Sequence, residues 1–252
     1  MSSNIFFYII IFLLGITIGS FTNVCIYRIP AKEDIVIKPS HCMGCGKRLK
    51  WYELIPVMSW ICLRGRCLSC KMPISVQYPL IEAVNGILYI GIYMINGRKA
   101  ESLLYCLLAS ALLTLSVIDL RTYEIPFGIN LFILALGLIH LALDYKNWEL
   151  YVIGFFTVSV FLGLLLLLSK GKAIGGGDMK LMAAAGLLLG WKLIILAFLI
   201  ACILGAVIHS MRMRVMKEGN VLAMGPYLAA GIMLAALFGN TWISWYIGLL
   251  VS

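Results

Sequence analysis

Long apolar runs separated by polar segments dominate this chain, and they leave few folds open. A run of about 20 apolar residues can cross the hydrocarbon core of a bilayer as one helix. Because 62% of the residues are apolar and only 12% are charged, a soluble protein of this length would lack the polar groups to cover its surface. We therefore expect an all-α polytopic membrane protein. An ordinary soluble enzyme, a disordered chain and a coiled coil are excluded.

About eight transmembrane helices are expected. They cover residues 5–27, 79–96, 102–120, 128–144, 149–169, 178–190, 193–211 and 224–250. The run 178–190 is short for a span, which a helix starting inside the protein at membrane depth would explain. The last run is interrupted by Gly239 and Asn240, so it could form one long helix or two short ones.

The polar segment between the first two apolar runs divides the chain into three expected parts. These are a first transmembrane helix (1–27), a cytosolic module (28–78) and a transmembrane core (79–252). With the N-terminus outside, 16 of the 20 Lys and Arg residues lie in cytosolic segments, as the positive-inside rule requires. Orientation in a membrane therefore accounts for the net charge of +9, and we expect no nucleic-acid partner.

Two CxxC pairs stand out in the module. Cys42 and Cys45 form the first, Cys67 and Cys70 the second, and 21 residues separate the pairs. Four thiolates in such a pattern converge tetrahedrally on a structural zinc and leave no open position for a substrate. Two disulfides, four free thiols or an iron–sulfur cluster are the alternatives, and His41 could replace one ligand. A cytosolic location disfavours the disulfides.

Two aspartates at the ends of apolar runs are the candidate catalytic pair. Asp119 and Asp178 both fall at cytosolic helix ends and so share one depth. Carboxylates in a membrane are costly and are functional candidates by default. Two carboxylates within hydrogen-bonding reach share a proton, so one can activate a water while the other acts as an acid. Gly175 and Gly177 leave room for a peptide to approach, which makes them candidate substrate-binding residues.

Purely structural interpretations of both aspartates remain open. Asp119 could pair with Arg121, and Asp178 could cap a helix N-terminus. A proton-coupled transporter would also use two buried acids. A membrane scaffold with a zinc module and no chemistry is a third possibility.

Several motifs together resemble one known family, the bacterial type IV prepilin peptidases. Gly175-Gly176-Gly177-Asp178 fits the GxGD motif of membrane aspartyl proteases, and Asp119 before Ile125-Pro126 resembles the region of the other catalytic aspartate. Further similarities are Gly19-Ser20-Phe21-Thr22-Asn23-Val24, Arg28-Ile29-Pro30, the two CxxC pairs, residues 63–67 and 74–82, and Met224-Gly225-Pro226-Tyr227-Leu228. The resemblance covers residues 15 to about 230.

The resemblance implies an activity and its site. Members cleave the basic leader of type IV prepilins and pseudopilins at the cytosolic face of the bacterial inner membrane, and many then methylate the new N-terminus with S-adenosylmethionine. By position, Asp119 and Asp178 would be catalytic, and the four paired cysteines would be the zinc ligands of the bifunctional branch. A peptidase that has lost methylation is the alternative within the family.

The methylation site is less defined in the sequence. No GxGxxG fingerprint follows a strand, so any S-adenosylmethionine site would have to come from cytosolic loops and helix ends. Glu82, near the cytosolic end of the second helix, is either a participant in this site or a structural partner for an Arg of the module. The basic module itself is expected to rest on anionic lipid headgroups. The oligomeric state cannot be inferred from the sequence.

Overall fold

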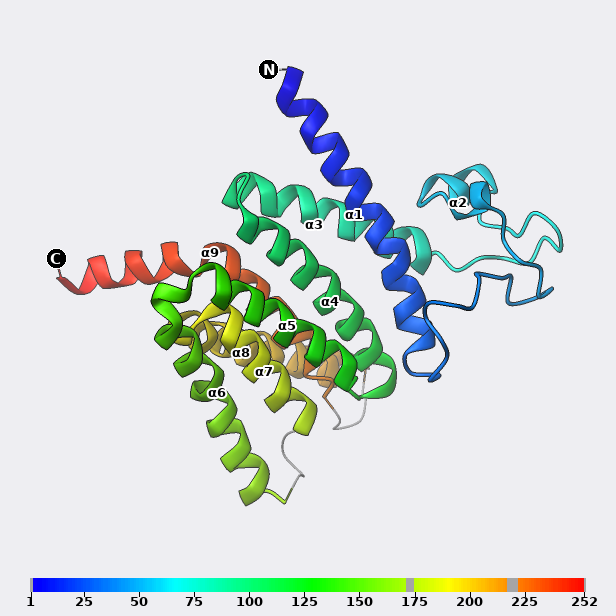
Figure 1. The fold of residues 1–252 in the computed structure, drawn as a ribbon. Helices are drawn as coiled ribbons and strands as arrows, with labels where there is room; N and C mark the ends of the chain where they lie inside the picture. Colours follow the sequence, from blue (N-terminus) through cyan, green and yellow to red (C-terminus); the bar gives the residue numbers. More distant parts are fainter. Residues whose placement is uncertain (1, 171–174, 217–221, 252) are drawn as a thin grey trace. The chain divides into compact units, whose positions relative to one another are not determined.

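A computed structural model describes residues 2–170, 175–216 and 222–251 (Figure 1). In this part of the chain the fold is all-α, as predicted. The long helices are α1 (Ser2–Arg28), α3 (Gln77–Asn96), α4 (Ala100–Thr122), α5 (Phe127–Leu143), α6 (Trp148–Leu168), α7 (Gly176–Leu189), α8 (Trp191–Met216) and α9 (Gly225–Val251). The short ones are η1 (Trp51–Leu54), α2 (Met58–Cys62) and η2 (Tyr145–Asn147).

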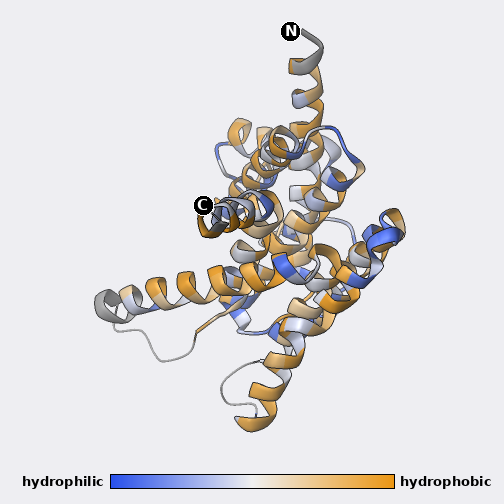
Figure 2. Cartoon of the chain, turned by 90° about the vertical axis from the view of Figure 1, so that its left-hand side faces the viewer, coloured by the Kyte–Doolittle hydropathy of each residue, from blue (hydrophilic) through white to orange (hydrophobic). Residues whose placement is uncertain are grey.

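Six of the described helices are long and apolar enough to cross a membrane. α5, with 17 residues, and α7, with 14, are shorter. Apolar residues run along the helices in Figure 2, whereas hydrophilic residues gather mainly in the connecting segments. The protein is therefore a multi-pass membrane protein. Gly239 and Asn240 do not interrupt the last apolar run, because α9 continues through both as one helix.

The chain forms two compact units, and the first is Met1–Ser102. Its core is the packing of α1 against α3. A Cβ at Gly15 would lie 2.7 Å from the Cα of Gly86, so the two helices approach as closely as glycine permits. The amide nitrogen of the buried Asn85 side chain donates to the Gly15 carbonyl at 2.7 Å. This bond locks the glycine contact in register. The division into 1–27, 28–78 and 79–252 stays a prediction.

The second unit, Leu103–Ser252, is built around α7. This helix packs against α5, α6, α8 and α9, and each of its residues from Leu181 to Leu189 is buried. The carbonyl of Gly154 on α6 lies against Gly186, where either glycine would clash if it carried a side chain. α7 is therefore surrounded by protein along most of its length. This explains how so short a helix exists here, as the sequence predicted.

Candidate functional site

Asp119 occupies the last turn of α4 and is only 4% exposed. Its Oδ2 accepts a hydrogen bond from the backbone N–H of Gly225 at 2.7 Å. Gly225 is the first residue of α9, and a Cβ there would lie 2.7 Å from the same oxygen. Only glycine thus lets the start of α9 approach this carboxylate.

Asp178 is the third residue of α7 and is half-buried. Its Oδ2 accepts a hydrogen bond from the N–H of Gly175 at 3.3 Å, so this carboxylate does cap the helix N-terminus, as one interpretation expected. Capping also fixes the side chain, because the helix start and the carboxylate hold each other. Asp178 can therefore cap the helix and still be a candidate catalytic residue.

Gly177 is held in place from α5. Its carbonyl accepts a hydrogen bond from the side-chain amide of Asn130 at 3.3 Å, and a Cβ at this position would lie 2.8 Å from the Cβ of Ile125. Gly175, by contrast, is exposed. Gly177 is therefore a packing requirement next to Asp178, whereas Gly175 leaves backbone open to an approaching chain.

Both aspartates belong to the second unit. They are close enough for the charge of Asp119 to act on Asp178. Each carboxylate also receives a backbone N–H from a glycine, at Gly225 and Gly175 respectively. The structure thus places one carboxylate in the last turn of α4 and one in the first turn of α7, each bonded to a glycine N–H.

Two positioning residues were not predicted from the sequence. Gly225 belongs to a motif that carried the family resemblance, yet nothing in the sequence connected it with Asp119, 106 residues away. Asn130 is 4% exposed within an apolar run, and a buried polar residue there was the signal that could have found it.

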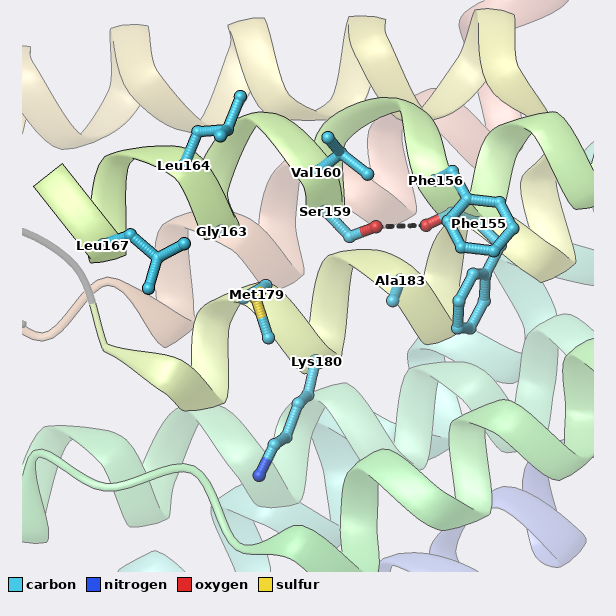
Figure 3. Close-up of a pocket in the computed structure, with 10 residues that line it drawn as sticks. All are labelled: Phe155, Phe156, Ser159, Val160, Gly163, Leu164, Leu167, Met179, Lys180 and Ala183. Carbon is cyan, nitrogen blue, oxygen red and sulfur yellow. Dashed lines mark hydrogen bonds between the residues drawn. The ribbon is translucent and has the colours of Figure 1, made fainter.

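A hollow of about 450 Å³ lies between α6 and α7, on another face of α7 (Figure 3). It is lined by Phe155, Phe156, Ser159, Val160, Gly163, Leu164, Leu167, Met179, Lys180 and Ala183. Successive residues on a helix point about 100° apart, so Met179 and Lys180 turn away from the direction of Asp178. The hollow is almost wholly apolar and is not the aspartate site.

In the first unit, Glu82 is 6% exposed and holds the module to α3. Its Oε2 accepts a hydrogen bond from the N–H of Val57 at 2.7 Å, and Ser20 is a second partner. The expected structural partner was an Arg side chain, but the module residue bound here is a backbone N–H. A carboxylate can satisfy a backbone donor without a second buried charge.

Val57 adopts an unusual conformation at this contact. Its φ of 62° and ψ of −53° are rare for a β-branched residue. The N–H of Met58 donates to the Pro56 carbonyl at 2.6 Å, which closes the three-residue turn that such angles produce. The Glu82 hydrogen bond therefore sits on a strained turn.

The four paired cysteines form one cluster. Their sulfur atoms all lie within 4.8 Å of one another, and the Sγ atoms of Cys42 and Cys70 are 3.7 Å apart. Tetrahedral coordination with Zn–S bonds of about 2.3 Å requires sulfur separations of about 3.8 Å. The N–H groups of Cys45 and Gly44 lower the pKa of Cys42 to about 6, which favours a thiolate. The cluster fits a four-coordinate metal ion.

Both CxxC pairs use the same backbone turn. The N–H of Cys42 donates to the Lys47 carbonyl and that of Cys67 to the Met72 carbonyl, each at 2.9 Å. Gly46 and Lys71 occupy the same position in the two turns, with φ values of 68° and 61°. The turns aim two sulfurs each at one point.

Comparison with known proteins identifies the family of this chain. Residues 13–95 match the bacterial peptidase A24 N-terminal domain, and residues 106–210 match the type IV leader peptidase family. The chain belongs to the type IV leader peptidase family. The resemblance inferred from the motifs is confirmed, and the chain is a membrane peptidase of this family.

Several curated relatives are called prepilin leader peptidase/N-methyltransferase. The one from Burkholderia pseudomallei (strain 1026b) is 34% identical, over 90% of this chain and 84% of the relative. The Pseudomonas putida relative is 32% identical, over 90% and 89%. That from Bacillus subtilis (strain 168) is 32% identical, over 94% and 97%. No solved structure matches the chain at a significant level.

The contact between Gly225 and Asp119 generates a prediction. In Gly225→Ala the new Cβ would meet Oδ2 at 2.7 Å, so the Asp119 side chain has to move. A shift of about 1 Å can cost on the order of a hundredfold in rate, and we expect leader-peptide cleavage to fall at least tenfold. Gly205→Ala is the control, since its Cβ would meet Tyr227 at an ordinary 3.6 Å. Equal activity of both variants would contradict this role of Gly225.

Proposed function

We propose that this protein removes the basic leader peptide from type IV prepilins or pseudopilins by a two-aspartate mechanism, and then methylates the new N-terminus. The observation that carries the cleavage half is that Asp119 and Asp178 each accept a glycine N–H, while the charge of Asp119 reaches Asp178. The matching GxGD motif and the names of the relatives support the substrate class.

The pair can hydrolyse a peptide bond without a covalent intermediate. One carboxylate takes a proton from a water molecule as the water oxygen attacks the scissile carbonyl carbon. The other, protonated, gives its proton to the carbonyl oxygen. Collapse of the tetrahedral species breaks the C–N bond, and the nitrogen leaves with a proton. The two aspartates titrate as a unit, so the roles belong to the pair.

The exposed backbone at Gly175 is the proposed place where the substrate chain passes Asp178, with Gly177 keeping that backbone in position. We place the active site at the cytosolic face of a bacterial inner membrane, with the N-terminus outside. The distribution of Lys and Arg supports this orientation. A basic leader would then stay in the cytosol while the apolar stretch behind it enters the bilayer.

Substitution of either aspartate tests the peptidase mechanism. Asp119→Asn and Asp178→Asn keep the side-chain shape but cannot take up the water's proton, so we expect cleavage of a co-expressed prepilin to be lost. Intact-mass analysis of the prepilin gives the result. Asp144→Asn is the control, since Asp144 follows α5 and bonds Tyr151 and Asn147 instead. Normal cleavage by either of the first two variants would refute the two-aspartate mechanism.

We propose zinc as the ion held by Cys42, Cys45, Cys67 and Cys70. Four thiolates saturate a zinc ion, so it would fix the fold of the module and take no part in chemistry. The bonds would join the two CxxC turns of the module.

Metal analysis of the purified protein tests this assignment. We expect one zinc per chain in the wild type and none in Cys45→Ser, with a lower unfolding temperature for the module. Cys62→Ser is the matched control, because Cys62 is an exposed thiol of the same module outside the cluster. Iron in place of zinc, or retention of zinc by Cys45→Ser, would overturn the proposal.

S-adenosylmethionine would supply the methyl group for the second activity. The names of the relatives and the cysteine pairs of the bifunctional branch support it. Glu82 is the proposed participant on this chain, because it is an acid at the junction of α3 with the module.

The variant Glu82→Gln distinguishes a role of Glu82 in methylation from a purely structural role in holding the Val57 turn. Glutamine keeps an oxygen that can accept the Val57 N–H, so the turn remains held while the charge is lost. We expect methylation to fall at least tenfold with cleavage retained, measured as the methyl increment on a cleaved prepilin. Glu101→Gln, at an exposed acid of α4, is the control. Full methylation by Glu82→Gln would leave Glu82 with a structural role alone.

Module residues 28–78 carry nine Lys and Arg residues against three Asp and Glu. A basic surface is a poor partner for a basic leader, so we propose that it lies against anionic lipid headgroups instead.

A further inference from the structure

The loop that follows α1 presents two aliphatic side chains to the outside. Val36 and Ile37 are 83% and 84% exposed, the highest values among the large apolar side chains of the described residues. They are adjacent in sequence, and neither contributes to the core of its unit. Such a pair is costly to leave in water, whereas isolated exposed apolar residues are ordinary.

Hydrogen bonds hold this turn in shape. Oδ1 of Asp34 accepts the N–H of Val36 and the N–H of Ile37, each at 2.7 Å. These bonds, that to Ile37 first, hold the pKa of Asp34 below its usual range. Lys38 and Glu33 close the base of the turn through an ion pair of 2.6 Å. The two aliphatic side chains therefore project from an ordered turn.

Arg28 fixes the turn to the end of α1. Its guanidinium donates to three carbonyls, those of Asp34 at 3.0 Å, Lys38 at 2.6 Å and Pro39 at 3.3 Å. Arg28 is the last residue of the candidate membrane span Ile5–Arg28. The residue that ends the span thus also binds both sides of the turn. The turn is thereby tied to the end of the candidate span.

We propose that residues 33–38 form a membrane-interface anchor, in which Val36 and Ile37 enter the headgroup–acyl boundary of the leaflet where α1 ends. Lys32 precedes the turn and would lie among the anionic phosphates, as basic residues do beside inserted apolar ones, while Lys38 stays paired with Glu33. The proposal deepens the lipid contact proposed for the module by naming the segment that inserts. It does not depend on the peptidase mechanism.

Photo-crosslinking in nanodiscs tests the anchor on the full-length protein. p-Benzoylphenylalanine replaces Ile37 in one variant and Met43 in the other. Met43 is 80% exposed in the same module but lies outside the turn. In nanodiscs of phosphatidylethanolamine and phosphatidylglycerol, we expect at least fivefold more lipid adduct from position 37, measured by mass spectrometry. Equal adduct from both positions would overturn the proposal.

A second variant tests whether the shape of the turn directs the insertion. Asp34→Ala removes both hydrogen bonds to the tip, so in combination with the label at position 37 we expect the lipid adduct to fall at least threefold. Unchanged adduct would show that the turn does not direct insertion. Adduct with a co-expressed prepilin in place of lipid would assign the turn to substrate binding instead. Cleavage is measured in parallel, so failure of the peptidase proposal and failure of the anchor are distinguishable.

Discussion

Enclosure of α7 by four other helices is the constraint on which the second unit depends. Inside a bilayer every backbone polar group needs a partner within the protein, and an irregular chain at membrane depth survives only where protein surrounds it. α7 is buried from Leu181 onward, whereas its glycine-rich start, residues 175–180, is exposed or half-buried. Asp178 can then sit at a helix start near Asp119, although a full-length span would place it elsewhere.

Four acids of this protein are held by backbone N–H groups. Asp119 binds Gly225, Asp178 binds Gly175, Glu82 binds Val57, and Asp34 binds Val36 and Ile37. A backbone donor orients a carboxylate without placing an opposite charge beside it. In the proposed mechanism both carboxylates have to exchange protons, which a tight partner such as Arg would prevent.

Much of this arrangement could be predicted from the sequence, and the rest depends on contacts between distant segments. Hydropathy runs gave the long helices to within a few residues, since a span has a fixed minimum length. The CxxC spacing predicted the sulfur cluster because each pair folds locally. By contrast, Gly225 beside Asp119 and Asn130 beside Gly177 join segments far apart in the chain. Glu82 was expected either to take part in methylation or to pair with an Arg of the module. Its hydrogen bond from the Val57 N–H was not predicted, because a sequence does not show which main-chain donors come near.

The turn at Val57 places backbone strain where the module meets α3. Backbone strain of this kind stores about 1–3 kcal/mol, and here a single carboxylate on α3 opposes its release. Loss of the Glu82 hydrogen bond would remove the contact that ties this strained turn to α3.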